Sequence, residues 1–245
     1  MEITIKKNVE INSVEQWFIV APPKGKEKQW KNGRSAKELA RFATDPSFKE
    51  FISSILKQEG LREQDFVCEP EAETELKSAI DMGISGPRNH DLLMIGSKDC
   101  VIGLEAKVSE SFGNNTIGEE WIKADTKNKK EKRIPGLVQF ITNNTYTNFS
   151  GVPDRIKSLM YQLFTATVGT IIEAKKRGKK NALVLVLVFT GNVDKESGYN
   201  DKMKQNQSDF EAFVQEFFPN GEAIIQNVRC RLRKVEVEIT SPYQF

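Results

Sequence analysis

Residues 91–108 read DLLMIGSKDCVIGLEAKV, in which two apolar runs flank a short polar segment. The runs DLLMI and CVIGLEAKV resemble β-strands, and GSKD between them is typical of a hairpin turn. A turn centred at or beside Lys98 places Glu105, or an immediate neighbour, opposite Asp91 in an antiparallel pair. Lys107 lies two residues beyond Glu105, so it points to the same face of the sheet. The sequence therefore predicts a hairpin face that carries two carboxylates and one ammonium group.

The other face of this hairpin is predicted to be apolar. Side chains alternate along a strand, so the residues between the polar ones point the opposite way. The residues expected to enter the core are Leu92, Met94, Ile102, Leu104 and Ala106.

The polar residue types of the hairpin suit phosphodiester hydrolysis. Paired carboxylates such as Asp91 and Glu105 form an oxygen-ligand site for a hard cation such as Mg²⁺. The metal polarises a phosphate and lowers the pKa of its bound water. A lysine beside the metal, here Lys107, can orient that water and offset the charge that develops on the phosphate oxygens.

The sequence before the hairpin predicts strands followed by helices. Residues 1–22 contain the alternating run EITIKKNVEI and then WFIVAPP, and we expect one or two strands there. A capping-box pattern at Ser35 and Glu38 predicts a short helix. A second helix is expected from Asp45, which precedes a proline, to Gly60.

The sequence after the hairpin predicts a crossover helix and a buried strand. Residues 154–176 keep one apolar face for about six turns of helix. ALVLVLVF, residues 182–189, is apolar on both faces, as in a central strand parallel to its neighbour. Another capping-box helix is expected to open at Ser208, and the runs AIIQNV and RKVEVEIT predict closing strands. This order predicts an α/β fold with a mixed sheet.

The hairpin motif resembles that of the PD-(D/E)XK superfamily of restriction-endonuclease-like nucleases. Asp91 is followed by thirteen residues and then by Glu-Ala-Lys at 105–107. GPRNHDLLMI and EAKVSESFG also look like a bacterial branch of that superfamily. The resemblance covers roughly residues 45 to 190, and it departs at His90, where the family usually has proline.

The resemblance implies a restriction-endonuclease-like core of helix, β-meander, helix and strand, with N- and C-terminal extensions. Residues 1–60 would be the N-terminal extension, and 61–245 the nuclease core with an insertion at 109–150. The two are expected to form one compact unit. Mg²⁺ is the implied cofactor, which Mn²⁺ can replace, held by Asp91 and Glu105.

Other residues are weaker candidates for the same site. A third acidic metal ligand is expected upstream, and Glu71 is our candidate, although its neighbourhood also suits a solvated acidic turn. Gln162 is expected to face the site from the crossover helix, or else to be a polar helix edge. His90 can touch a phosphate or act as a general acid, or it can be a strand-end histidine bonded to a neighbour. Glu110 can reach the metal or be a solvated loop acid. Trp30 can stack on a base, although a packing role is favoured.

The composition is that of an ordinary globular protein, with 38% hydrophobic and 29% charged residues in a chain long enough to bury a large core. No apolar run is long enough to span a bilayer, and the N-terminal sequence lacks the apolar centre of a signal peptide. We therefore expect a cytoplasmic protein without a membrane partner. The three cysteines lack zinc-ligand spacing and are expected to be small buried hydrophobes.

The charge pattern gives a weaker indication of the partner. A net charge of +2 does not itself announce a nucleic-acid partner. Two basic runs, at 123–133 and 175–180, are typical of solvated loops unless they flank a site that acts on phosphates.

Together these patterns predict a metal-dependent hydrolase of nucleic acid. The favoured form is a DNA endonuclease of a restriction, defence or repair type, with a homodimer as a possible assembly. One alternative is an inactive nucleic-acid-binding protein on the same fold. Another is a partner-binding protein in which Asp91, Glu105 and Lys107 form only a surface salt-bridge cluster.

Overall fold

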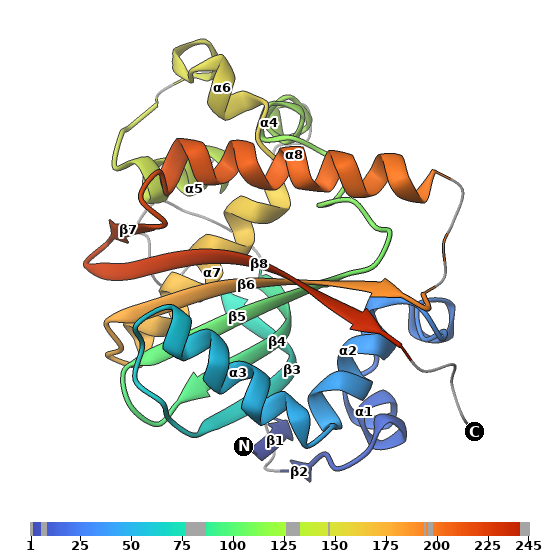
Figure 1. The fold of residues 1–245 in the computed structure, drawn as a ribbon. Helices are drawn as coiled ribbons and strands as arrows, with labels where there is room; N and C mark the ends of the chain where they lie inside the picture. Colours follow the sequence, from blue (N-terminus) through green and yellow to red (C-terminus); the bar gives the residue numbers. More distant parts are fainter. Residues whose placement is uncertain are drawn as a thin grey trace.

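The protein, described by a computed structural model, folds into one mixed β-sheet with helices on both faces (Figure 1). The structure describes residues 2–5, 9–76, 87–125, 133–146, 148–193, 195 and 198–240. The strands are β1 (Glu2–Ile5), β2 (Val9–Glu10), β3 (Phe66–Glu75), β4 (Pro87–Gly96), β5 (Cys100–Lys107), β6 (Asn181–Gly191), β7 (Glu222–Ile225) and β8 (Val228–Ile239). The α-helices are α1 (Val14–Val20), α2 (Ser35–Thr44), α3 (Ser47–Gln58), α4 (Ile117–Asp125), α5 (Arg133–Thr142), α6 (Asp154–Lys157), α7 (Tyr161–Lys176) and α8 (Tyr199–Phe217). The expected α/β class with a mixed sheet is confirmed.

The strands follow the order β2-β1-β3-β4-β5-β6-β8-β7 across the sheet. Strands β3, β4 and β5 form an antiparallel meander, and β6 runs parallel to both β5 and β8. Helix α7 connects β5 to β6, so this parallel pair has the helical crossover that such pairs require. The central position expected for residues 182–189 is confirmed, since the side chains of that run are buried between two neighbours.

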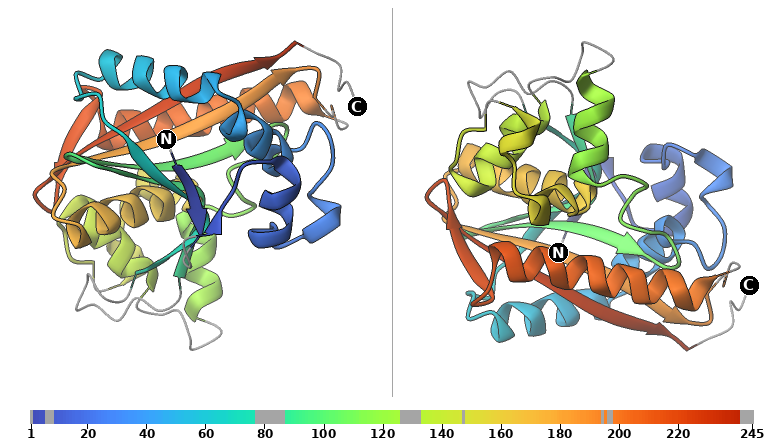
Figure 2. Two further views of the ribbon diagram at one scale, coloured as in Figure 1. Left: turned by 90° about the horizontal axis from the view of Figure 1, so that it is seen from below. Right: turned by 90° about the horizontal axis from the view of Figure 1, so that it is seen from above.

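The two faces of the sheet carry separate hydrophobic cores. One core joins the sheet to α1, α2 and α3, and the other joins it to the helices between 117 and 218. Figure 2 shows α3 on one face and the green-to-yellow helices of residues 117–176 on the other. All five apolar hairpin residues expected in the core belong to the cluster beneath α1–α3, which confirms the predicted alternation.

The strands expected in EITIKKNVEI are confirmed as β1 and β2, but the N-terminal extension has a helix at WFIV where a strand was expected, so that part of the prediction is wrong. WFIV lies within α1, whose N-cap is Ser13: its Oγ accepts a hydrogen bond from the N–H of Gln16 at 3.2 Å. The buried side chain of Trp17 then anchors the helix on the sheet. An apolar run of four residues does not by itself distinguish a strand from a short helix, and here the N-cap decides.

The prediction of one long crossover helix over 154–176 is also wrong, because α6 and α7 are separate helices. Met160 at the break has extended backbone angles and forms a β-bridge with Thr116. The N–H of Tyr161 donates to the carbonyl of Asn115 at 3.1 Å, a bond that a continuous helix would not allow. Pairing with the chain that follows β5 therefore starts α7 at Tyr161.

The helix expected to open at Ser208 starts earlier, and this boundary is corrected. Helix α8 begins at Tyr199, after Gly198 in a left-handed conformation with φ 75°. Ser208 is thus inside the helix. The capping pattern there does not mark a helix start, because the helix already runs through that position. The buried side chain of Asn206, in the same helix, donates to the carbonyl of Glu110 at 2.8 Å.

Several other expectations hold. Helices α2 and α3 match the predicted spans, and the Asp45 carboxylate accepts the N–H of Ser47 at 2.8 Å as a helix-starting acid. The three cysteines are free and buried, as expected. Among the helices described, none combines the length and apolar character needed to cross a membrane. Most of the basic run 123–133 lies outside the described residues.

Candidate active site

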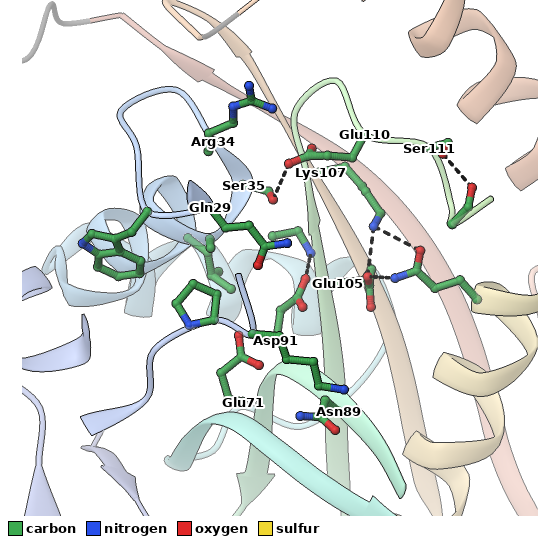
Figure 3. Close-up of a pocket in the computed structure, with 18 of the residues that line it drawn as sticks. Gln29, Arg34, Ser35, Glu71, Asn89, Asp91, Glu105, Lys107, Glu110 and Ser111 are labelled. Carbon is green, nitrogen blue, oxygen red and sulfur yellow. Dashed lines mark hydrogen bonds and ion pairs between the residues drawn. The ribbon is translucent and has the colours of Figure 1, made fainter. Parts of the chain in front are cut away.

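A cleft of about 480 Å³ opens where β4 and β5 meet the start of α7 (Figure 3). One side is built from β3, β4 and β5, and the other from the segment that joins α1 to α2. We call these the strand side and the N-terminal side. Seven of the eight candidate residues line the cleft: Asp91, Glu105, Lys107, Gln162, Glu71, Glu110 and Trp30.

Asp91 lies at the point where the β4–β5 ladder ends. The last pair of the ladder is Leu92 with Leu104, and one further step in that register places Asp91 opposite Glu105. Instead of a backbone pair, the Asp91 Oδ2 accepts the N–H of Ala106 at 2.7 Å. The carboxylate is thereby fixed against β5, close to the position that the hairpin pattern predicts.

Glu105 and Lys107 form a buried ion pair that Gln162 completes. Lys107 Nζ donates to Glu105 Oε1 at 3.0 Å and to Gln162 Oε1 at 3.2 Å, while Gln162 Nε2 donates to Glu105 Oε1. Glu105 is 2% exposed and Lys107 is 6% exposed. Gln162 is the second residue of α7, so the break after α6 is what aims its amide at the strand side.

Arg88 is a second cation on Glu105 that the sequence analysis missed. Its Nη2 donates to Glu105 Oε2, so both carboxylate oxygens are occupied. Burial alone would raise the pKa of Glu105, but the charges of Arg88 and Lys107 outweigh it and lower that pKa to about 2. Glu105 is therefore an anion throughout the physiological pH range.

Glu71 enters the cleft from β3 through an unusual backbone conformation. Pro70 pairs with Leu92 and Ala72 with His90, and this β3–β4 register places Glu71 opposite Asp91. Its φ of 49° is left-handed, which is uncommon for a residue other than glycine. Such a conformation costs on the order of 1 kcal/mol or more and is found most often at functional sites.

The surroundings of Asp91 and Glu71 favour the neutral forms of their carboxyl groups. Burial and then the Glu105 charge raise the pKa of Asp91 to about 7. Burial followed by the charges of Asp91 and Glu105 raises the pKa of Glu71 to about 8. A cation between these carboxylates would favour their charged forms, and their oxygens are the ligands that Mg²⁺ prefers.

The donor set therefore fits a hard divalent cation by charge and chemistry. Among the described residues, no three His, Cys, Asp or Glu side chains are already arranged as a ligand group. The reason is visible at Glu105, whose oxygens bind Arg88, Lys107 and Gln162. A metal at this site would share Glu105 with those partners or displace one of them.

A family described as a domain of unknown function, DUF6946, matches residues 10–239. The chain belongs to this family. The match includes both sides of the cleft. No match was found among curated proteins or among solved structures.

His90 of this DUF6946 domain lies outside the cleft. It is buried, and its Nε2 lies 3.0 Å from Thr74 Oγ1 on β3. Its ring fills the close contact between sheet and helix: a Cβ added at Gly169 of α7 would lie 3.1 Å from the imidazole. Burial, followed by the charge of Arg88, lowers the pKa of His90 to about 3, so the ring is neutral. This geometry agrees with the alternative of a strand histidine bonded to a neighbour.

Glu110 belongs to the cleft but points to the N-terminal side. Its Oε1 accepts the hydroxyl of Ser35 at 2.7 Å, and its Oε2 accepts the N–H of Val108 at 2.7 Å. Ser35 therefore connects the start of α2 to the exit of β5, instead of closing the predicted capping box. Glu38 instead accepts the N–H of Gly33 at 2.7 Å.

The N-terminal side of the DUF6946 cleft is basic and aromatic. It includes Lys24, Lys28, Gln29, Trp30 and Arg34. The sequence signal for this side is the lysine-rich run KGKEKQWKNGR, residues 24–34, which contains Trp30. By contrast, the basic run 175–180 begins in the last turn of α7, at the end away from Gln162, and does not line the cleft.

Proposed function

We propose that this DUF6946 protein is a nuclease that requires a divalent metal ion. Asp91 and Glu105 would hold Mg²⁺, with Glu71 as a third oxygen ligand, and Lys107 would position the attacking water. The observation that carries the proposal is the buried Glu105–Lys107 pair beside the anchored carboxylate of Asp91, at the base of an open cleft.

The order of the elements supports a restriction-endonuclease-like fold as part of the proposal. Helix α3, the meander β3-β4-β5, helix α7 and the parallel strand β6 follow the order of the PD-(D/E)XK core. In this comparison Asp91 falls on the second strand of the meander, and Glu105 with Lys107 on the third.

The side chains of the cleft have distinct tasks in the proposed reaction. When bound, the metal ion would polarise the phosphate and lower the pKa of its bound water. Gln162 and Glu105 hold the Lys107 ammonium in one position, so its charge is preorganised for the phosphate oxygens. Phe112, whose ring centroid is 5.7 Å from Lys107 Nζ, is buried beneath it and keeps water from that side.

Burial of the ion pair argues against a purely structural salt-bridge cluster. Exposed pairs contribute little and are common, but burying a charged pair carries a desolvation penalty that often exceeds its attraction. Glu105 and Lys107 are both buried next to an open cleft, where apolar residues would be equally compatible with folding. An inactive binding protein on this fold remains the alternative that the experiment tests, and DNA as substrate and a homodimer stay predictions.

The experiment combines metal titration with cleavage. Calorimetry with Mg²⁺ and Mn²⁺ is run on the wild type, Asp91→Asn and Lys107→Met, alongside cleavage of mixed single- and double-stranded DNA and RNA. We expect Asp91→Asn to lose metal binding. Lys107→Met should retain it but lower the cleavage rate by about 10²- to 10³-fold, because it removes preorganised charge.

Lys179→Ala is the matched control, since that lysine lies at the far end of α7, outside the cleft. A thermal melt of each variant shows whether it has folded. Wild-type protein that cleaves no nucleic acid with either metal, or a folded Lys107→Met variant with full activity, would contradict the proposal.

A further inference from the structure

We propose that the N-terminal side of the cleft binds an unpaired nucleotide, with its base stacked on Trp30 and its backbone held by Lys24, Lys28 and Arg34. The proposal rests on the nuclease function above and names its substrate class: a strand whose bases are unpaired at the site. Four features of the described residues lead to it.

Trp30 is placed for stacking. The chain has three tryptophans, and Trp17 and Trp121 are 2% and 5% exposed, whereas Trp30 is only partly buried and lines the cleft. The Phe18 ring lies against Trp30 with centroids 5.1 Å apart and a tilt of 31°. Phe18 thus supports the indole and fixes its orientation, as a stacking platform requires.

The loop that carries Trp30 has a defined shape. The N–H of Trp30 donates to the carbonyl of Lys26 at 3.0 Å, and the N–H of Gly25 donates to Gln29 Oε1 at 2.9 Å. Pro23, at the start of the loop, is buried. These contacts hold the aromatic and basic side chains on one wall, so little order has to be gained when a ligand binds.

Charge divides the cleft into two halves. The strand side presents the carboxylates of Glu71, Asp91 and Glu105, with Arg88 and Lys107 both bound to Glu105, and the N-terminal side presents its lysines and an arginine. Figure 3 shows Arg34 and Gln29 on one side and Glu71 and Asp91 on the other. A scissile phosphate at the carboxylates would need a metal ion, whereas the next phosphates along the strand can bind the cations opposite.

Lys24 and Glu71 line the same cleft from its two opposite sides. One nucleotide can therefore bridge the two sides: its phosphate would approach Glu71 while its base faces the wall of residues 23–35.

Stacking on a side wall requires a free base face. Inside a duplex both faces of each base are covered by neighbouring base pairs, so Trp30 could stack only on an unpaired, flipped or terminal base. Aromatic side chains interleaved with cations are the usual surface for single strands, and they bind with little dependence on sequence. DNA and RNA share this chemistry, so the probes below distinguish them.

The test measures binding without metal, so that it does not depend on catalysis. The full chain in EDTA is titrated with dT12, with rU12 and with a dA12·dT12 duplex, and binding is followed by tryptophan fluorescence and by anisotropy of a labelled strand. We expect a single strand to bind at least about tenfold more tightly than the duplex and to quench Trp30 emission.

Variants test whether the single strand binds to the N-terminal side of the cleft. Trp30→Ala should weaken single-strand binding by about tenfold or more, and Trp30→Phe should restore most of it, because phenylalanine still stacks. Lys24→Ala combined with Lys28→Ala should lower the salt dependence of binding by up to about 1.4 in log–log slope. Ile19→Ala is the control: Ile19 is 75% exposed on α1 and does not line the cleft.

The outcomes separate this inference from the proposed function. Equal or tighter binding of the duplex, no binding of either strand, or no effect of Trp30→Ala would overturn the inference. Tighter binding of dT12 or of rU12 would support it and identify the sugar. Duplex cleavage without single-strand binding would leave the nuclease proposal intact. Trp30-dependent binding by a protein that neither binds metal nor cleaves would remove the nuclease proposal alone.

Discussion

The two sides of the cleft are built in different ways. On the strand side, Glu105 and Lys107 are buried in a sheet, paired with each other and held by Gln162. The N-terminal side is a partly exposed connection between helices, and the hydrogen bond from Ser35 to Glu110 links it to the exit of β5. The proposed chemistry thus lies on rigid elements and the proposed recognition on a connecting segment, as is usual for enzyme sites.

The largest expected effect comes from separating α7 from the strand side. A Cβ at Gly103 of β5 would overlap the Oγ1 of Thr170 on α7 and lie 3.1 Å from His90 Nδ1. Gly103→Ala should therefore lower the free energy of unfolding by about 3 kcal/mol, measured by urea denaturation. It should also reduce cleavage, because α7 carries Gln162.

Gly151→Ala is the matched control for that variant, since a Cβ there meets only an ordinary contact at 3.4 Å. Its unfolding free energy should stay close to that of the wild type. Equal stability of the two variants would show that α7 is not packed closely on β5. The strand side could then no longer be described as the more rigid of the two sides.

The next effect concerns the charge imbalance of the strand side. Burial and the Glu105 charge raise the pKa of Asp91 to about 7 in the folded state, above its ordinary value of 3.8. Between those pH values the folded protein keeps a proton that the unfolded chain releases. The stabilisation is therefore complete below about pH 4 and is lost as the pH rises through about 7.

Asp91→Asn should remove that pH dependence, because the amide oxygen can still accept the Ala106 N–H without a charge. In EDTA at pH 8 we expect the variant to be more stable than the wild type by about 1 to 2 kcal/mol, with the difference vanishing near pH 4. Thermal melts across this range measure it. Parallel pH profiles for the two proteins would contradict the assignment.

The smallest effect tests the link between the two sides. Ser35→Ala removes the 2.7 Å hydrogen bond to Glu110 and should lower the free energy of unfolding by about 1 kcal/mol. Metal binding should be unchanged, because Asp91 and Glu105 keep their own partners, while binding on the N-terminal side weakens. Ser150→Ala, which removes only a local bond to Asn148, is the control in the same calorimetric and denaturation measurements.

The strand side was largely predictable from the sequence, and the N-terminal side was not. Alternation and a short hairpin relate Asp91 to Glu105 by local geometry alone, and this geometry holds to within the last step of the ladder. Trp30 and Ser35 reach the cleft only through the packing of α1 and α2 on the sheet, which no local pattern encodes.

Two strand-side details were also beyond local patterns. Arg88 was not predicted, because strict alternation along β4 puts it on the opposite face from Asp91, whereas in the structure its guanidinium reaches Glu105. The start of α7 at Tyr161, which is later than the sequence predicts and which aims Gln162, depends on a β-bridge between segments more than forty residues apart. In both cases a non-local contact overrides the periodicity of the sequence.

The placement of β8 has a consequence for the order in which the chain matures. Asn181 of β6 lies beside Arg229 of β8, 48 positions later (229 minus 181), and β6 in turn supports β5. Such distant pairings slow folding, because the intervening chain must be closed into a loop first. During synthesis, every proposed catalytic residue leaves the ribosome before the strand that completes the sheet. A nascent chain would thus carry these residues without a complete sheet, and the proposed site could become active only after β8 has paired with β6.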